Sequence, residues 1–208
     1  MEVNLKNLTP DVRKLSDMKN VLYDQEWLKT RPKEYPDFDV YYMYRNLKED
    51  NGLKYNITIT MPKMLGQEFP KTKGHAHIEN FQEIYVVLEG EAIYLMQKTN
   101  GEIVEDVYAV KAKRGEAAII PAGYGHVTIN SSALELKTGD WTSINCKSDY
   151  SLFEKLHGAC YYYILRDPKG TPSGQTSWIK NENYKSIPEL RFEQPLKSIP
   201  ENLDFLKE

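Results

Sequence analysis

The sequence predicts an all-β protein built as an antiparallel sandwich or barrel. Ten short runs rich in β-branched and aromatic residues lie between residues 38 and 165, separated by Gly, Asn or Asp where hairpin turns need them. Helical patterns long enough to join parallel strands do not alternate with these runs. Fifteen tyrosines against six phenylalanines favour the same fold, because tyrosine suits strands and polar-walled pockets. The expected strands cover residues 39–46, 55–61, 83–89, 91–98, 105–112, 116–121, 126–130, 133–137, 141–146 and 159–165.

Two extensions are expected to flank this barrel, which should span residues 38–165. The N-terminal extension, residues 1–37, contains a helical pattern from Ser16 to Trp27 with Ser16 or Asp17 as its cap. The C-terminal extension, residues 166–208, contains two Ser-Ile-Pro-Glu stretches that begin at Ser186 and Ser198. Each matches a capping box with proline in the first turn, and the second should open a short C-terminal helix.

The composition excludes several classes of function. A formal net charge of −3 gives no basic surface for nucleic acid or for an anionic membrane. No run of about 18 apolar residues could cross a membrane, and the first ten residues lack the basic and apolar regions of a signal peptide. We therefore expect a cytoplasmic protein, in which Cys146 and Cys160 are free thiols.

The stretch KTKGHAHIENFQEIY, residues 71–85, carries a candidate metal site. His75 and His77 are two positions apart, so in a strand both imidazoles point to the same face. Glu83 begins the next expected strand, and a turn would return it to the histidine pair. Such a set suits Fe²⁺, Mn²⁺, Ni²⁺ or Zn²⁺ and leaves coordination positions open for a substrate. The histidine pair alone is weak evidence, because two histidines at this spacing are more often exposed residues at the end of a strand.

A second stretch, GEAAIIPAGYGHVTIN, strengthens the metal hypothesis. Together the two stretches resemble the two motifs of the cupin family. The second motif of that family is matched at every spacing by Gly115, Pro121, Gly123, His126 and Asn130. The resemblance implies a double-stranded β-helix, or jelly-roll barrel. It also implies one divalent metal ion held by His75, His77, Glu83 and His126, with Fe²⁺ as the first choice.

One spacing departs from the general cupin pattern. Five residues separate His77 from Glu83, where the first motif usually has three or four. A longer turn is therefore expected between these two ligands.

The flanking residues are similar to the cupin-type glucose-6-phosphate isomerases of archaea and some bacteria. The resemblance runs from about residue 13 to 165 and rests on RKLSDM, ITITMP, TKGHAH and EIY. It implies a metal-dependent aldose–ketose isomerase of glycolysis and gluconeogenesis that interconverts glucose 6-phosphate and fructose 6-phosphate. It also implies a homodimer, which fits the need to protect open sheet edges.

The resemblance assigns roles to residues around the metal. Glu83 is the candidate base, which would pass a proton between C1 and C2 of the sugar through an enediol intermediate. The alternative route is a direct hydride shift between the two carbons. Tyr85 and Tyr41 would orient the sugar hydroxyls. The phosphate would be bound by Thr58, Thr72, the backbone N–H of Gly74 and the charge of Lys73. Packing in the barrel wall would explain the two tyrosines as well, and β-propensity would explain Thr58.

The region after the second motif departs from the family. The family has a tyrosine followed by a sequence close to DAGHDY, of which only Asp149 and Tyr150 remain. Asn145 stands near the tyrosine position, and His157 comes too late to replace the missing histidine. A cupin dioxygenase and a non-enzymatic sugar-binding cupin share the metal ligands, so only the TKG segment favours the isomerase over them.

Overall fold

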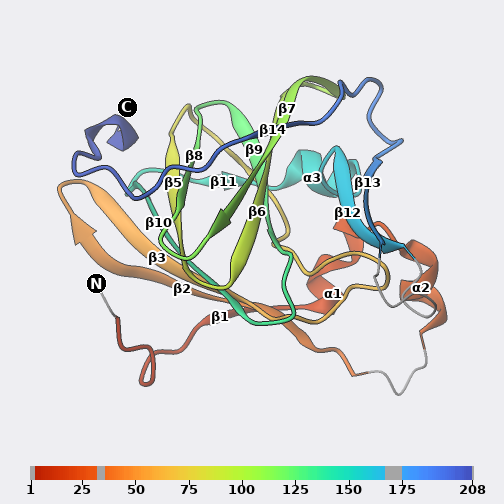
Figure 1. Ribbon diagram of the computed structural model, residues 1–208, viewed down its shortest axis with the longest axis horizontal. Coiled ribbons are helices and arrows are strands. Elements are labelled where there is room, and N and C mark those ends of the chain that lie inside the picture. Colours follow the sequence, from red (N-terminus) through yellow and green to blue (C-terminus); the bar gives the residue numbers. More distant parts are fainter. Residues whose placement is uncertain (1–2, 32–35, 167–174, 208) are drawn as a thin grey trace.

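Two β-sheets face each other in the computed structural model, which describes residues 3–31, 36–166 and 175–207 (Figure 1). The larger sheet has the strand order β1-β2-β3-β10-β5-β8, and the smaller sheet has the order β14-β7-β6-β9. All neighbours in these sheets are antiparallel except β14 and β7, which are parallel. The architecture is the predicted jelly-roll barrel.

The larger sheet contains β1 (Asp11–Lys14), β2 (Asp39–Asp50), β3 (Leu53–Thr60), β10 (Leu136–Ser143), β5 (Glu83–Glu89) and β8 (Ala117–Ile120). The smaller sheet contains β14 (Arg191–Glu193), β7 (Ile103–Lys113), β6 (Glu91–Asn100) and β9 (Tyr124–Asn130). Two further pairs are formed by β4 (Ala76–His77) with β11 (Ser148–Asp149) and by β12 (Tyr161–Arg166) with β13 (Gln175–Lys180). The helical elements are α1 (Leu15–Met18), η1 (Lys19–Val21), α2 (Gln25–Thr30), α3 (Ser151–Lys155) and η2 (Asp204–Lys207).

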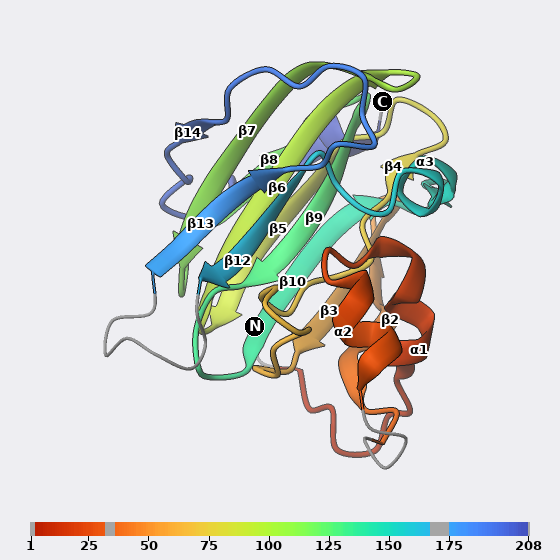
Figure 2. The same ribbon diagram turned by 90° about the vertical axis from the view of Figure 1, so that its right-hand side faces the viewer.

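Alternating side chains divide the core into three layers. Between the sheets, Tyr85 of β5 packs in one cluster with Tyr94 and Met96 of β6. The outer face of the smaller sheet presents Leu95 and Val127 to a cluster that includes residues of α1, α3 and β12, and β12 and β13 lie over this sheet in Figure 2. On the outer face of the larger sheet, η2 and the chain before it cover β3, β5 and β8. This arrangement leaves the pleats that face inward between the sheets available for a site.

One long strand replaces two expected ones. The sequence pattern predicts strands at residues 133–137 and 141–146 with a turn at KTGD, but β10 runs unbroken through Gly139. The ring of Tyr55 on β3 occupies the space where a side chain at position 139 would lie. Gly139 therefore permits a close cross-strand contact and does not mark a turn.

The N-terminal helix is shorter and more broken than expected. The predicted helix from Ser16 to Trp27 is split into α1, η1 and α2, because the backbone at Leu22 is extended. The cap assignment is also wrong: the Ser16 hydroxyl donates to Asp37, and Lys14 is the N-cap of α1.

The C-terminal helix predictions are corrected as well. Ser186 pairs as a β-bridge with Ile103 and begins no helix. The C-terminal helical turn starts at Asp204, later than expected, and its backbone N–H is capped by Asn202. The β13 strand, which pairs with β12, was not predicted at all.

No helix in the described part of the chain is long and apolar enough to cross a membrane. Cys146 and Cys160 are both free thiols, as expected.

Candidate active site

His75, His77, Glu83 and His126 meet between the two sheets. One potential ligand atom from each lies within 4.8 Å of the others. Backbone pairing brings them together, because His75 and His126 exchange two hydrogen bonds, with N···O distances of 3.2 and 2.8 Å. His77 follows on β4, and Glu83 begins β5. The donor set is therefore assembled from three separate segments of the barrel.

The longer turn between His77 and Glu83 has a structural role. It places the Phe81 carbonyl oxygen 2.7 Å from Nδ1 of His77. A ring nitrogen held in this way can donate its proton to the carbonyl, which would leave Nε2 of a neutral His77 to face the cluster as a ligand atom. Nε2 of His77 lies 3.4 Å from Oε2 of Glu83, and Nε2 of His126 lies 3.2 Å from the same oxygen.

The charges within the cluster fit a bound cation. Burial lowers the pKa values of His75 and His126, so both rings are neutral and free to bind a metal. Burial opposes ionisation of Glu83, but the His126 and His77 rings hold the pKa of its carboxyl well below the usual range.

The buried oxygen Oε2 of Glu83 has no hydrogen bond of good geometry. Burial lowers the pKa of His77, yet Cys146 and Glu83 outweigh it and raise that pKa to about 11. A proton on His77 thus supplies the positive charge beside Glu83 that a bound cation would otherwise supply. Three imidazoles around a buried carboxylate oxygen without a good hydrogen bond suit a divalent metal, which would replace the proton on His77.

The cluster opens into a pocket of about 370 Å³. Most of the residues singled out from the sequence line it, namely Tyr41, Thr58, Thr72, Lys73, Gly74, His75, His77, Glu83 and Tyr85. His126 lies behind this wall and is almost fully buried.

The two tyrosines predicted to contact substrate are buried at the pocket wall. The Tyr85 hydroxyl lies 3.2 Å from Nε2 of His126, and burial raises the pKa of Tyr85 well above its usual value. The Tyr41 hydroxyl accepts a hydrogen bond from the backbone N–H of Lys73 at 3.3 Å, and burial raises the pKa of Tyr41 to about 12. Both hydroxyls therefore keep their protons at neutral pH.

The TKG segment is held tightly against β9. Thr72 donates its backbone N–H to Thr128 at 2.9 Å and accepts the N–H of the same residue on its hydroxyl at 3.0 Å. Gly74 has a φ of +83°, and a side chain there would collide with Val127 and Phe153. The ammonium of Lys73 pairs with Glu154 at 2.5 Å, so its charge is already shared with a carboxylate.

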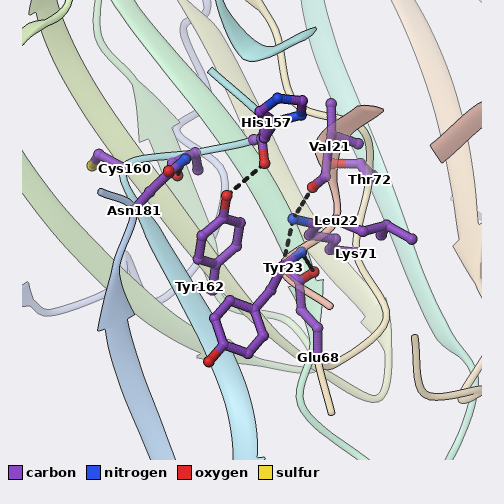
Figure 3. A network of polar contacts seen from close by, with 12 residues as sticks. Val21, Leu22, Tyr23, Glu68, Lys71, Thr72, His157, Cys160, Tyr162 and Asn181 are labelled. Atoms are coloured by element: carbon purple, nitrogen blue, oxygen red, sulfur yellow. Dashed lines mark hydrogen bonds and ion pairs between the residues drawn. The ribbon is translucent and has the colours of Figure 1, made fainter. Parts of the chain in front are cut away.

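A buried ion pair between Lys71 and Glu68 holds the residue directly before the TKG segment in place (Figure 3). Nζ of Lys71 lies 2.5 Å from Glu68 and donates to the carbonyl oxygen of Val21 at 2.7 Å. The other carboxylate oxygen of Glu68 accepts the backbone N–H of Tyr23 at 2.9 Å. The same contacts interrupt the predicted N-terminal helix, since they take its backbone groups at residues 21 and 23.

Several pocket residues escaped the sequence analysis. They are Met43, Arg45, Lys54, Asn56, Asp140, Thr142, Cys146, Lys147 and Ser148. Asp140 is buried and accepts a hydrogen bond from Asn56 at 2.6 Å; burial and the nearby Glu83 raise its pKa well above the usual value. Its inward position follows from strand alternation along β10, which the expected turn at KTGD concealed.

The residues after the second motif are only partly in the site. Tyr150 lines the pocket, with its ring centroid 5.5 Å from that of His75. Asn145 is exposed and is not among the lining residues. His157 lies in the turn after α3, where its carbonyl oxygen accepts the Tyr162 hydroxyl at 2.6 Å. It takes no part in the pocket wall.

Comparison of the sequence with models of known protein families assigns the chain to one family. Residues 12–180 match the family model described as glucose-6-phosphate isomerase (GPI). The chain belongs to this family.

Relatives named glucose-6-phosphate isomerase include those of Pyrococcus horikoshii and Thermococcus litoralis. The first is 30% identical over 122 residues, which cover 58% of this chain and 62% of the relative. The second is 30% identical over 129 residues, which cover 61% of this chain and 66% of the relative. The chain thus spans less than two thirds of the length of these isomerase-family relatives.

Solved structures give a more distant likeness. Oxalate oxidase in complex with glycolate is 18% identical, with a TM-score of 0.44, and the match covers 54% of this chain and 55% of that one. A likeness at this level does not bear on function.

Proposed function

We propose that this protein is a metal-dependent isomerase that interconverts glucose 6-phosphate and fructose 6-phosphate. The cluster of three histidines and one glutamate at the wall of a cationic pocket carries this proposal. Arg45, Lys54, Lys73 and Lys147 line the pocket, whereas its two acidic lining residues are Glu83 and Asp140. The high pKa of Asp140 leaves Glu83 as the single lining carboxylate that is ionised. Such a pocket attracts an anionic substrate.

We propose that His75, His77, Glu83 and His126 hold one divalent ion, with Fe²⁺ as the first choice and Mn²⁺, Ni²⁺ or Zn²⁺ as alternatives. When bound, the ion would polarise the sugar carbonyl and the adjacent hydroxyl.

The chain itself supplies the groups that move and steer protons. Glu83 is ionised at neutral pH, so it can act as a base toward a proton on the sugar. The neutral hydroxyls of Tyr85 and Tyr41 can donate hydrogen bonds to sugar oxygens. The sugar phosphate would lie against Thr58, Thr72, Lys73 and the backbone N–H of Gly74.

A coupled isomerase assay with metal analysis tests the proposal. After loading with Fe²⁺ or Mn²⁺, we expect conversion of fructose 6-phosphate and close to one metal per chain. His126→Ala should lose both. His157→Ala is the matched control, because His157 lies outside the pocket, and it should keep both. Loaded protein with no conversion would overturn the proposed function.

The same preparation separates the alternatives. Oxygen consumption with a small organic substrate would identify an oxygenase, and phosphosugar binding that survives removal of the metal, without turnover, would identify a binding protein. Glucose 6-phosphate deuterated at C2 distinguishes the two isomerisation routes, since an enediol loses the label to water and a hydride shift retains it.

We also propose a cytoplasmic homodimer that acts in glycolysis and gluconeogenesis. The β1 strand is the outer strand of the larger sheet, and the nearby side chains of Leu8 and Val12 are 43% and 38% exposed. Sedimentation of the wild type and of a Val12→Lys variant tests this, because a charge on the edge should shift the protein to monomer.

A further inference from the structure

Arg45 reaches the pocket through an irregularity in β2. Tyr44 pairs with Ile57 and Lys48 pairs with Tyr55, so residues 45–47 lie opposite Asn56 alone. Asn46 in this bulge has a φ of +53°, and its backbone N–H donates to the Asn56 side chain at 2.9 Å. Bulges of this kind re-aim a side chain beside an active site. Here the bulge begins at the single arginine among the described residues that line the pocket.

The guanidinium of Arg45 has an exposed partner that is easy to displace. Its Nε lies 2.9 Å from Oδ2 of Asp11 on β1, and the two side chains are 45% and 66% exposed. Exposed ion pairs of this kind contribute little free energy. Burial lowers the pKa of Arg45, but the charge and hydrogen-bond interactions with Tyr150 and Asp11 outweigh it and raise that pKa. The residue is thus a permanent cation at the pocket wall with a weakly held partner.

Lys73, the cation expected from the sequence, is less available. Its side chain is only 14% exposed and is paired with Glu154 at 2.5 Å. An arginine fork also matches the oxygens of a phosphate better than a single ammonium does.

We propose that Arg45 binds the phosphate group of the substrate, exchanging Asp11 for the phosphate oxygens. This inference rests on the proposed function and deepens it by naming a specificity-determining residue for the phosphosugar. Arg45 would also take over substrate contacts of the histidine and tyrosine that the chain lacks after the second motif, because Arg45 and Tyr150 interact with each other and line the same pocket.

Opposite effects of two variants test the proposal. Arg45→Gln should weaken the binding of both inorganic phosphate and glucose 6-phosphate by at least about tenfold, the loss expected for a charge-assisted hydrogen bond. Asp11→Asn removes the competing carboxylate, so phosphate should bind with equal or greater affinity. If Arg45 served only to anchor β1, both variants would break the same ion pair and would change in the same direction.

The measurement is titration calorimetry on the metal-loaded protein, with inorganic phosphate and with glucose 6-phosphate, alongside thermal melting to confirm folding. Lys48→Gln is the matched control, because Lys48 lies on the same strand in an exposed pair with Asp50 and does not line the pocket; its affinities should stay within about twofold. In turnover assays, Arg45→Gln should raise KM far more than it lowers kcat, and Arg45→Lys should recover part of the affinity.

Equal phosphate affinity in wild type and Arg45→Gln, or parallel losses in Arg45→Gln and Asp11→Asn, would overturn the inference. Phosphate binding needs no turnover, so it is separable from the proposed function. Wild type that binds phosphate through Arg45 but does not isomerise would overturn the isomerase and support the phosphate site.

Discussion

Removing the Lys71 ammonium should destabilise the protein and loosen the segment that carries His75 and His77, two of the proposed metal ligands. In Lys71→Met, a side chain of similar length keeps the apolar packing but leaves Glu68 buried without its cation. The side chains of Lys71 and Glu68 are only 4% and 2% exposed, so water cannot take over the lost interactions. The carbonyl oxygen of Val21 also loses its donor.

The size of the effect follows from this burial. Breaking a buried ion pair by removing one partner costs about 3–5 kcal/mol. For a chain of this size each kcal/mol lowers Tm by roughly 2–4 °C, so Tm should fall by roughly 6–20 °C. The loss should depend on pH. Burial raises the pKa of Glu68 even with Lys71 present, and removing Lys71 raises it further. A raised carboxyl pKa favours the folded state at low pH, so the deficit should grow as pH rises above the ordinary pKa of glutamate.

Urea unfolding and thermal melting of the variant measure this cost. Lys137→Met is the control, because its pair with Glu89 spans 3.4 Å and the Glu89 side chain is 63% exposed; it should cost less than about 1 kcal/mol. Replacing both partners, as Lys71→Met with Glu68→Leu, should recover part of the stability. If Lys71→Met costs no more than Lys137→Met, or if the double variant is worse than the single one, the reasoning about the buried pair is wrong.

Three further predictions concern single residues. Gly74→Ala should cost about 2–4 kcal/mol in urea unfolding, because alanine disfavours the left-handed backbone there and its methyl group would clash with Val127. Gly101→Ala has open space around the new methyl group, so it should cost only about 1 kcal/mol. Lys155 and Lys185 hold the pKa of Glu102 at about 2. Glu102→Gln should therefore lower the urea midpoint at pH 7, and this difference should vanish as pH falls toward 2. Tyr85→Phe should reduce kcat in the isomerase assay while metal content stays unchanged, because the hydroxyl borders the metal cluster without belonging to it; metal loss in this variant would contradict that role.

Local patterns in the sequence predicted most of the barrel. The strand from Glu83 to Glu89 has the expected bounds because its β-rich run is bounded by turn residues. The four members of the candidate metal cluster were found because two stretches of the sequence resemble the two cupin motifs, and the structure adds that His75 and His126 pair across neighbouring segments. The helix expected at Ser16 failed because its backbone groups are taken by Glu68 and Lys71, which lie about 50 residues further along the chain.

The missed pocket residues share a different cause. Arg45 faces the pocket through a bulge, and Asp140 faces it because β10 continues through Gly139. Neither event leaves a local signal: the bulge depends on pairing with Asn56, and the unbroken strand depends on the ring of Tyr55. Side-chain direction at such points is decided by the neighbouring strand, so reasoning along one segment at a time does not reach it.

The position of β10 also determines how the chain can be assembled. It is bonded on one side to β3 and on the other to β5, two strands that precede it by many residues. As the chain is synthesised, both of these strands present open edges until residue 136 and those after it arrive. We expect folding to be slow and the nascent chain to be prone to aggregation at this stage. The part of the pocket wall that Asp140 and Thr142 form therefore appears only when β10 closes the sheet.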